Sequence, residues 1–565
     1  MTSSITEAAV QGLREALLKA AGRAVADGVF PAEPIPAFAI EVPADRAHGD
    51  FATNIAMASA RALHMAPRKI AEALTARLEL SGTYFDRFEI AGPGFINFFL
   101  TPRYYADAMQ QIVAQGASYG RSDFGGGKRV LVEFISANPT GPMHMGNARG
   151  GALGDCLAAV LDAAGFYVER EFYVNDAGNQ IEKFGLSLSV RYQQLFLGED
   201  AVPLPEECYQ GADIIDRAKE YAAEHGDALM HVSDEERRHA LVSFALPRNI
   251  ARMKQDIAKY RITYDTWFLE STLHESGQVR DTIQLLTDRG LTYEKEGALW
   301  YRATAFGAEK DEVLIRANGN PTYFAADIAY HRNKFAVRKF DECIDVWGAD
   351  HHGHVARMKG AMNAIGLDGD KLVVVLMQLV NLVRDGKPVK MSKRTGKAIQ
   401  LADLLDEVPV DAARFLFNMR EATSQMDFDL DLAVQQDAQN PVYYVQYANA
   451  RICSILRALE ADGIVPRNCT PEELMQLTRP EEQELIRHLA ALPDEIVESA
   501  QEYDPARITR YVITLANLFH KFYNACRVKG EEESLMQARL QLCRATRTAI
   551  CNVLTMFKIS APEQM

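Results

Sequence analysis

Hydrophobic and polar residues follow three successive patterns along this chain, and the first of them spans residues 1–118. Helical segments there flank a short alternating stretch at 88–98, which turns at Gly92-Pro93-Gly94. Alternation with a period of two beside a Gly/Pro turn is typical of antiparallel strands. We therefore expect an α+β unit at the N-terminus.

The pattern changes over residues 119–436, where continuous apolar runs are separated by long helical segments. The runs lie at 130–136, 166–176, 344–350 and 371–380. Apolar strands that alternate with helices predict a doubly wound, Rossmann-like parallel sheet. The stretch at about 195–300 is polar and helical and lacks such runs, so we expect an insertion at the periphery of the sheet.

Residues 437–565 show only helical periodicity. Apolar residues at three- and four-residue spacings form one stripe there: Val442, Val445, Ala448, Ile452, Ile455 and Leu459. Such a stripe is the buried face of an amphipathic helix. The whole pattern predicts a multidomain α/β protein, with a parallel-sheet core between an α+β N-terminal domain and an all-α C-terminal bundle.

Composition narrows the class of protein. A chain of 565 residues is too long for one core. Its net charge of −15 counts only weakly against a nucleic-acid partner, because phosphates are bound by local basic patches. The eight cysteines form no C-x-x-C pair, which argues against structural zinc and a disulfide framework. With no signal peptide or membrane-spanning run evident, we expect a cytoplasmic protein with no membrane partner.

The first candidate for chemistry is the loop after the apolar run at 130–136. Asn138-Pro139-Thr140-Gly141-Pro142 breaks the strand, and a small-residue helix follows His144 and Gly146. A strand, a polar loop and a helix N-terminus together form an anion site. The loop is neither G-x-G-x-x-G nor a P-loop. His144 could donate to a phosphate oxygen, although a structural role fits it equally well by itself.

A second candidate lies almost 250 residues downstream, at 384–399. Five cations occur within eleven residues, with no acid among them: Lys387, Lys390, Lys393, Arg394 and Lys397. A bare cation run is often only a solvated face. This run includes Ser392 and follows an expected strand, at the edge of a parallel sheet where ligands bind. Cations there suit a triphosphate whose charge shifts during a reaction.

Together the two stretches resemble the signatures of class I aminoacyl-tRNA synthetases. His144-Met145-Gly146-Asn147 is similar to the HIGH signature, and Lys390-Met391-Ser392-Lys393-Arg394 is similar to KMSKS. Further segments resemble the arginyl-tRNA synthetase family: GDFATNIAM with GPGFINFFL, YVNDAGNQI, YFAADIAYHRNKF, WGADHHGHVARM, VDAARF and NPVYYVQYANARI. The resemblance covers nearly the whole chain.

The resemblance implies that ATP, L-arginine and the tRNA for arginine react to give arginyl-tRNA, AMP and diphosphate. It assigns 1–118 to a tRNA-contacting domain, 119–436 to catalysis and 437–565 to anticodon binding. ATP would be bound by His144, Gly146, Asn147, Lys390, Ser392 and Lys393, of which His144, Asn147, Lys390 and Lys393 would be catalytic. Asn147 stands where the signature has its second histidine, and it cannot carry charge.

The resemblance also implies which residues bind the arginine substrate: Glu133, Asn138, Tyr323, Asp327 and Asp350. A guanidinium needs a planar acceptor such as a carboxylate. Tyr323 and Asp327 are four residues apart in an expected helix and would face the same way. The spacing alone favours Asp327 as a surface carboxylate of the helix. The resemblance favours a substrate-binding role instead.

The run Asp350-His351-His352-Gly353-His354 raises the alternative of a transition-metal site. Its spacing differs from the i, i+4 histidine pair of a zinc-binding helix, and no cysteines accompany it. We expect Mg²⁺ carried by ATP, and no structural zinc.

Three other functions are alternatives to this prediction. A smaller nucleotidyltransferase would leave both flanking regions unexplained, and the cysteine enzyme of class I would need zinc ligands. A catalytically inactive RNA-binding relative would be expected to lose Lys390 and Lys393, which are present. A monomer is expected.

Overall fold

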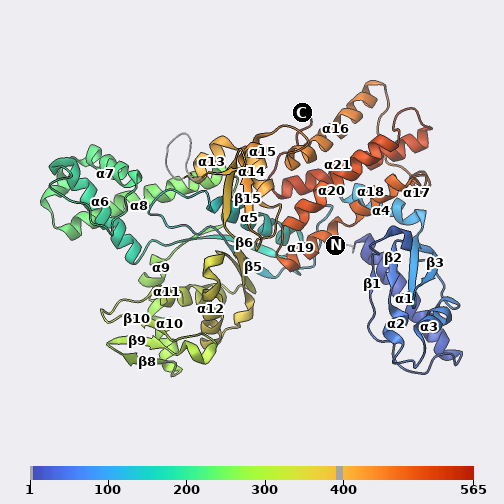
Figure 1. Cartoon of the computed structure of the whole chain (residues 1–565), viewed down its shortest axis with the longest axis horizontal. Coiled ribbons are helices and arrows are strands. Elements are labelled where there is room, and N and C mark those ends of the chain that lie inside the picture. The colour runs from blue at the N-terminus through green and yellow to red at the C-terminus, as the bar shows by residue number, and fades with distance from the viewer. Residues whose placement is uncertain (1–3, 390–398) are drawn as a thin grey trace.

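The computed structural model describes residues 4–389 and 399–565. Figure 1 shows the parallel sheet near the centre, with the N-terminal unit at one side and the helices α6–α8 at the other. The C-terminal helices lie beside the sheet and separate it from the N-terminal unit.

The N-terminal unit packs helices against a four-stranded sheet of order β1-β2-β4-β3, whose pairs are all antiparallel. Its strands are Ile40–Glu41, Phe51–Thr53, Phe85–Ala91 and Phe95–Leu100 for β1 to β4, and its helices are Ile5–Ala26, Ile55–Ser59 and Pro67–Thr75 for α1 to α3. The hairpin of β3 and β4 turns at Gly92–Gly94, so the predicted antiparallel strands are confirmed.

The central sheet has five parallel strands in the order β12-β11-β5-β6-β7. They are Arg129–Glu133 (β5), Tyr167–Val174 (β6), Thr266–Leu269 (β7), Glu342–Gly348 (β11) and Leu372–Met377 (β12). The helices α5 (Asn147–Ala163), α11 (Tyr323–Arg332) and α12 (His352–Ala364) belong to the same unit. The four predicted apolar runs form β5, β6, β11 and β12, which confirms the Rossmann-like prediction.

The stretch at 195–300 differs from the prediction. The helices α6 (Asn179–Leu197), α7 (Ala212–His225) and α8 (Asp234–Lys259) form a helical insertion with a small core of its own. The expectation of no further sheet strand is wrong, however, because β7 pairs with β6 at the sheet's edge. The run at 266–269 is only four residues long, and none of the four is fully buried, so its apolar signal is weak.

A second, antiparallel sheet of order β10-β9-β8 follows β7. Its strands are β8 (Thr292–Lys295), β9 (Ala298–Tyr301) and β10 (Glu312–Ile315). Two helices precede them in the chain, α9 (Ser271–Glu275) and α10 (Gln278–Asp288). This sheet packs with α10, α11 and α12 into one apolar cluster, so it supports α11 from outside the parallel sheet.

A small three-stranded sheet lies next in the chain, on either side of the lysine motif. It contains β13 (Val380–Arg384), β14 (Lys387–Pro388) and β15 (Met426–Asp429), with β13 parallel to β15. The helices α13 (Leu401–Glu407), α14 (Val410–Phe417) and α15 (Leu430–Val434) complete this region.

The C-terminal bundle is entirely helical in the described residues. Its helices are α16 (Pro441–Ala461), α17 (Pro471–Leu474), α18 (Pro480–Ala490), α19 (Leu492–Glu502), α20 (Ala506–Ala525) and α21 (Glu533–Met556), and α4 (Pro102–Gln115) packs among them. Five of the six residues in the predicted α16 stripe are buried, and Ile455 is half-buried.

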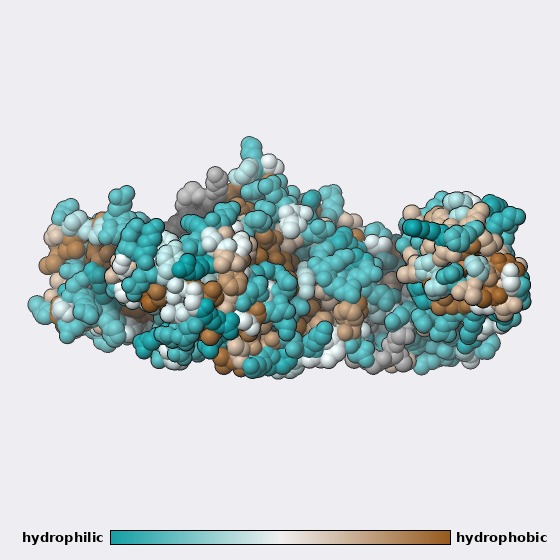
Figure 2. Space-filling model, turned by 90° about the horizontal axis from the view of Figure 1, so that it is seen from below, coloured by the Kyte–Doolittle hydropathy of each residue, from teal (hydrophilic) through white to brown (hydrophobic). Residues whose placement is uncertain are grey.

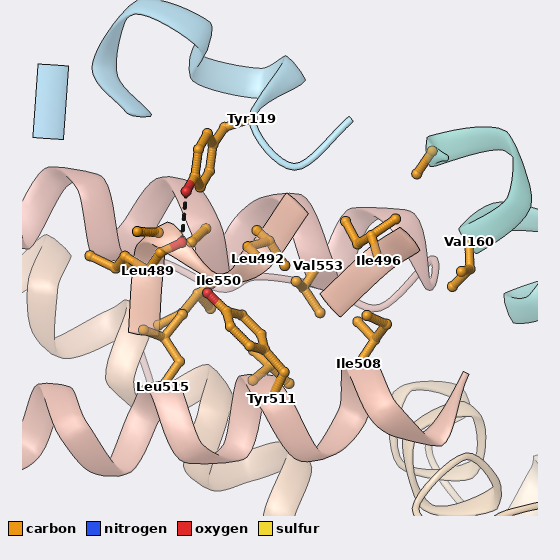
Figure 3. Packing of buried hydrophobic residues seen from close by; sticks show 14 of the residues in the cluster. Tyr119, Val160, Leu489, Leu492, Ile496, Ile508, Tyr511, Leu515, Ile550 and Val553 are labelled. Carbon is orange, nitrogen blue, oxygen red and sulfur yellow. Dashed lines mark hydrogen bonds between the residues drawn. The ribbon is translucent and has the colours of Figure 1, made fainter. Parts of the chain in front are cut away.

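The linker after α4 is fixed to the bundle. Tyr119 donates from its hydroxyl to the carbonyl of Leu489 at 2.7 Å, above a cluster formed by α18, α19, α20 and α21 (Figure 3). Val160 of α5 lies beside the same cluster. The bundle therefore packs directly on the helix that follows the His144 loop.

The face of the molecule in Figure 2 is mostly hydrophilic, with hydrophobic residues in scattered groups. None of the described helices is both long and apolar enough to cross a bilayer.

Candidate active site

The candidate site lies at the carboxyl edge of the parallel sheet. There the chain leaves β5 at Glu133, β6 at Val174, β7 at Leu269 and β11 at Gly348. Because parallel strands end on the same side, residues from distant parts of the chain meet at this edge, where open α/β sheets bind ligands.

The loop after β5 begins with two residues in the left-handed region. Ile135 has φ 69° and Ser136 has φ 44°, and a β-branched residue rarely adopts such a conformation. Ser136 is held by its hydroxyl, which donates to Glu133 Oε1 at 2.8 Å and accepts from the Tyr173 backbone N–H at 3.1 Å. Backbone strain of this kind persists where the surroundings impose it, often at functional sites.

His144 is exposed at the end of this loop, two residues before the cap of α5. Its Nδ1 accepts from the Gly146 backbone N–H at 3.1 Å, so a neutral ring carries its proton on Nε2. Gly146 is the cap and Asn147 the first residue of α5. Three of the predicted nucleotide-binding residues, His144, Gly146 and Asn147, therefore lie at or beside a helix N-terminus, with the imidazole as a donor.

A cleft of about 420 Å³ opens beside His144, and we call it the His144 cleft. It is lined by Gly141, Pro142, His144, Gly211, Ala212, Asp213, Asp216, Arg217, Glu220, Asn249, Arg252 and Gln400. Asn249 of α8 donates to the Pro139 carbonyl at 2.9 Å. The helical insertion therefore forms one wall of this cleft and supports the loop.

The backbone of the His144 loop pairs with the segment 399–401. Met145 N–H donates to the Ile399 carbonyl at 3.0 Å, and Leu401 N–H donates to the Met143 carbonyl at 2.9 Å. Lys390, Ser392 and Lys393 precede this segment and lie outside the described residues. The chain that leaves the lysine motif is thus attached to the loop that presents His144.

A second cleft, of about 520 Å³, lies between β5, β6, β11, α11 and α12, and we call it the acidic cleft. Its lining includes four carboxylates, Glu133, Asp327, Asp345 and Asp350, and three histidines, His331, His351 and His354. Arg357 also lines it, but its guanidinium is 2.8 Å from Glu312.

A buried ion-pair network forms the floor of the acidic cleft. Lys334, which is fully buried, lies 2.6 Å from Glu133 Oε2 and 2.8 Å from Asp345 Oδ1. Burial opposes ionisation of Asp345, yet Lys334 and His331 lower its pKa to about 2. Glu133 also accepts from Ser136 and from Tyr330. Glu133 lines the cleft, but hydrogen-bond donors of the protein already contact both of its carboxylate oxygens.

Asp327 is a carboxylate with few protein partners on the wall of the acidic cleft. Its side chain is 36% exposed, and its carboxylate lies 3.3 Å from Nε2 of the His354 imidazole. Tyr323, one turn earlier in α11, lies outside the cleft lining, with its ring next to Gly178. Asn138 is exposed on the first loop, also outside the lining. Asp350 does line the cleft, although 80% of its side chain is exposed.

Comparison with known proteins decides the family. Residues 10–100 match the arginyl-tRNA synthetase N-terminal domain, 108–452 match the catalytic domain of class I (R) tRNA synthetases, and 445–565 match the DALR anticodon-binding domain. The chain belongs to the arginyl-tRNA synthetase family.

Two curated relatives are both named arginine–tRNA ligase. The one from Acetivibrio thermocellus is 54% identical over all of both chains, and the one from Caldanaerobacter subterraneus subsp. tengcongensis is 56% identical over all of both. The Thermus thermophilus arginyl-tRNA synthetase structure has a TM-score of 0.74 at 22% identity, covering 98% of this chain and all of that one, which shows a shared fold. The resemblance drawn from the motifs is confirmed.

One buried carboxylate of this arginyl-tRNA synthetase family member was missed by sequence reasoning. Glu270 follows β7, is 3% exposed and accepts from the Tyr173 hydroxyl at 2.9 Å. Burial raises the pKa of Glu270, and the Asp327 charge adds to the effect. Tyr173 lines the acidic cleft. Recognising the short run Thr266–Leu269 as a strand would have placed Glu270 at the sheet's edge.

The residues at 4–389 and 399–565 contain no group of three His, Cys, Asp or Glu side chains arranged to hold a metal ion. In the Asp350 to His354 run, His354 contacts Asp327 and packs at 5.4 Å from the Trp347 ring.

Proposed function

We propose that this chain is an arginine–tRNA ligase, which uses ATP to attach L-arginine to its tRNA with release of AMP and diphosphate. The observation that carries the proposal is the acidic cleft beside the His144 loop, on a class I catalytic domain. A cationic amino acid and a nucleotide can meet at one sheet edge there. A nucleotidyltransferase would not need the matched N-terminal and anticodon-binding domains.

In this proposal ATP binds over the His144 loop. His144 donates to the phosphates from Nε2, while Gly146 and Asn147 present the start of α5 to the nucleotide. Asn147 contributes as a neutral donor. Lys390, Ser392 and Lys393 hold the β- and γ-phosphates as diphosphate leaves, an assignment that rests on the family motif. Mg²⁺ would enter with ATP and offset part of the charge of its phosphates.

Arginine would lie in the acidic cleft, with its carboxylate toward the α-phosphate of ATP. Asp327 supplies an acceptor for the guanidinium, and buried Glu270 supplies a second negative charge close to it. Tyr323 and Asn138 would have to reach the substrate from outside the cleft lining. Glu133 orients the floor through Lys334, and Asp350 contributes from the rim.

The tRNA would bind the bundle at a third cleft, of about 890 Å³, between α16, α20 and the C-terminus. Arg451 lies 4.9 Å from the Tyr447 ring centre and 5.0 Å from that of Tyr523, at this cleft. Cations beside aromatic rings suit unpaired nucleotides. The match of 445–565 to an anticodon-binding domain supports this surface. The domain limits 1–118, 119–436 and 437–565, a monomeric state and a cytoplasmic location remain predictions.

The deciding experiment is tRNA charging by the purified protein with arginine, lysine and citrulline in parallel. We expect acid-precipitable product with arginine only, dependent on ATP and Mg²⁺. Lys393→Ala is the control, since loss of a cation that acts on departing diphosphate should lower kcat far more than it raises the KM for arginine. An inactive RNA-binding protein would bind tRNA and charge it with none of the three.

A further inference from the structure

The first turn of α5 contains a buried arginine with no part in the scheme above. Arg149 is the third residue of α5 and only 1% exposed. Its Nη1 donates to the carbonyls of Gln378 and Ser424, both at 2.9 Å, and its Nη2 donates to the carbonyl of Glu421 at 2.8 Å. One guanidinium therefore joins α5 to two other chain segments through backbone atoms alone.

No carboxylate pairs with Arg149 within residues 4–389 and 399–565. Burial lowers the pKa of Arg149, and the neighbouring Arg420 lowers it further. A cation is also disfavoured in the first turn of a helix by the helix dipole. Burying a charge without a counter-ion is costly, so stability alone does not explain this choice of residue.

One of the three carbonyls that Arg149 holds, that of Gln378, belongs to the chain that enters the lysine motif, and the other two belong to the segment 421–424 that contacts Gln378. Gln378 follows β12 directly, and its N–H donates to the Ala422 carbonyl at 2.9 Å while its carbonyl accepts from Arg149. The next strand, β13, pairs with β15 and with β14, and β14 ends two residues before Lys390.

The other side of the same motif is fixed to the His144 loop. Ile399 and Leu401 pair with that loop through the two backbone hydrogen bonds described above. Helix α5 and its preceding loop are thus tied to the chain on both sides of the lysine motif, by Arg149 before it and by backbone pairing after it.

We propose that Arg149 is a positioning residue for the ATP-dependent step, an inference that rests on the proposed function. It fixes the chain that carries the lysine motif relative to the helix that presents His144, Gly146 and Asn147. Both phosphate-binding groups must meet one ATP, and a displacement near 1 Å at such a site costs about 100-fold in rate. A lysine cannot replace the planar fork, because its single ammonium does not span three carbonyls.

The test compares steady-state charging by wild type, Arg149→Gln and Arg149→Lys. We expect Arg149→Gln to lower kcat/KM for ATP about 10- to 100-fold, with little change in the KM for arginine. Arg149→Lys, which keeps the charge and part of the hydrogen bonding, should lose less. A purely structural role would not separate the ATP and arginine constants in this way.

The matched control is Arg237→Gln. Arg237 is 7% exposed and donates to the carbonyls of Leu229 and Val232, but it lies in the helical insertion. Its replacement should lower the melting temperature without changing the KM for ATP. If Arg149→Gln fails to fold, Arg149→Lys decides.

Folded Arg149 variants with wild-type kcat/KM for ATP would overturn the inference, as would an equal loss in the Arg237 control. A wild-type protein that charges no tRNA with arginine would instead overturn the proposed function.

Discussion

Two buried regions of this molecule differ in the number of cations that face their carboxylates. Asp155, in the middle of α5, is 1% exposed and contacts three cations: Arg414 at 2.5 Å, Lys558 at 2.9 Å and Arg170 at 3.1 Å. Burial opposes its ionisation, but Arg414 and Lys558 lower the pKa of Asp155. Here cations exceed acids, and the site joins α5, β6, α14 and the end of the C-terminal bundle.

The acidic cleft shows the reverse balance. Lys334 pairs with both Glu133 and Asp345. Among residues 4–389 and 399–565, Asp327 has only His354 within ion-pair distance, and the neighbouring Glu270 has only His274. Acids exceed fixed cations, so a positive ligand would complete the site. A carboxylate contacted by several cations forms a structural junction in this protein, whereas the proposed function assigns the cluster with fewer cations to a cationic substrate.

The largest effect should follow from Asp155→Asn. Removing this charge leaves three cations around a neutral side chain, and breaking a buried ion pair on one side costs about 3–5 kcal/mol in the free energy of unfolding. Urea unfolding measures the loss. The folded fraction should keep its KM for arginine.

Asp162→Asn is the control for that measurement, because Asp162 lies on the same helix with a half-exposed side chain paired to Arg121. Its effect should stay within about 0.5 kcal/mol. Equal losses in the two variants would contradict the distinction between a structural junction and a surface pair.

Asp327→Asn should act on catalysis and leave the fold intact. The proposed function places Asp327 opposite the guanidinium, so loss of its charge is expected to lower kcat/KM for arginine by about 2–5 kcal/mol of transition-state stabilisation. Preference for arginine over citrulline, which has a similar shape and no charge, should fall as well. Charging of arginine at near wild-type efficiency would transfer this role to another acid of the site, with Glu270 first.

A pH measurement tests whether Glu270 faces the substrate. Burial raises the pKa of Glu270 in the free protein, against hydrogen bonds from Tyr173 and His274. A bound guanidinium favours the ionised form and lowers that pKa again. At a pH between the pKa of Glu270 in the arginine complex and its higher pKa in the free protein, arginine binding must therefore release protons. Over that range the affinity for arginine must rise with pH, and the rise must stop above the higher pKa.

Calorimetric titration with arginine in two buffers of different ionisation enthalpy detects this release. The release should disappear in Glu270→Gln. Equal heats in both buffers for the wild type, over the range from about pH 4.3 upward, would place Glu270 away from the guanidinium.

Asp350→Asn should give the smallest effect. Its carboxylate is 80% exposed, and solvent screens charges at such positions. We expect kcat/KM for arginine to change by no more than about 1 kcal/mol. A loss comparable with that of Asp327→Asn would show that the rim acid contacts the substrate directly.

The sequence by itself determined the architecture and the family. Four of the five parallel strands follow from apolar runs, because a strand covered on both faces needs apolar residues along its length. The α16 stripe follows from helical periodicity. The two signature motifs and their order indicated the family, because they contain the residue types that the chemistry requires.

Only the tertiary structure decided how the acids and cations are paired. Glu133 and Lys334 are about 200 residues apart, and spacing along the chain contains no information on such a contact. The same holds for Arg149, whose buried guanidinium reaches carbonyls more than 200 residues downstream. Local patterns report which face of an element is buried. The partner across that face is determined by the packing of the whole chain, and this packing decides which carboxylates are paired with cations and which have few protein partners.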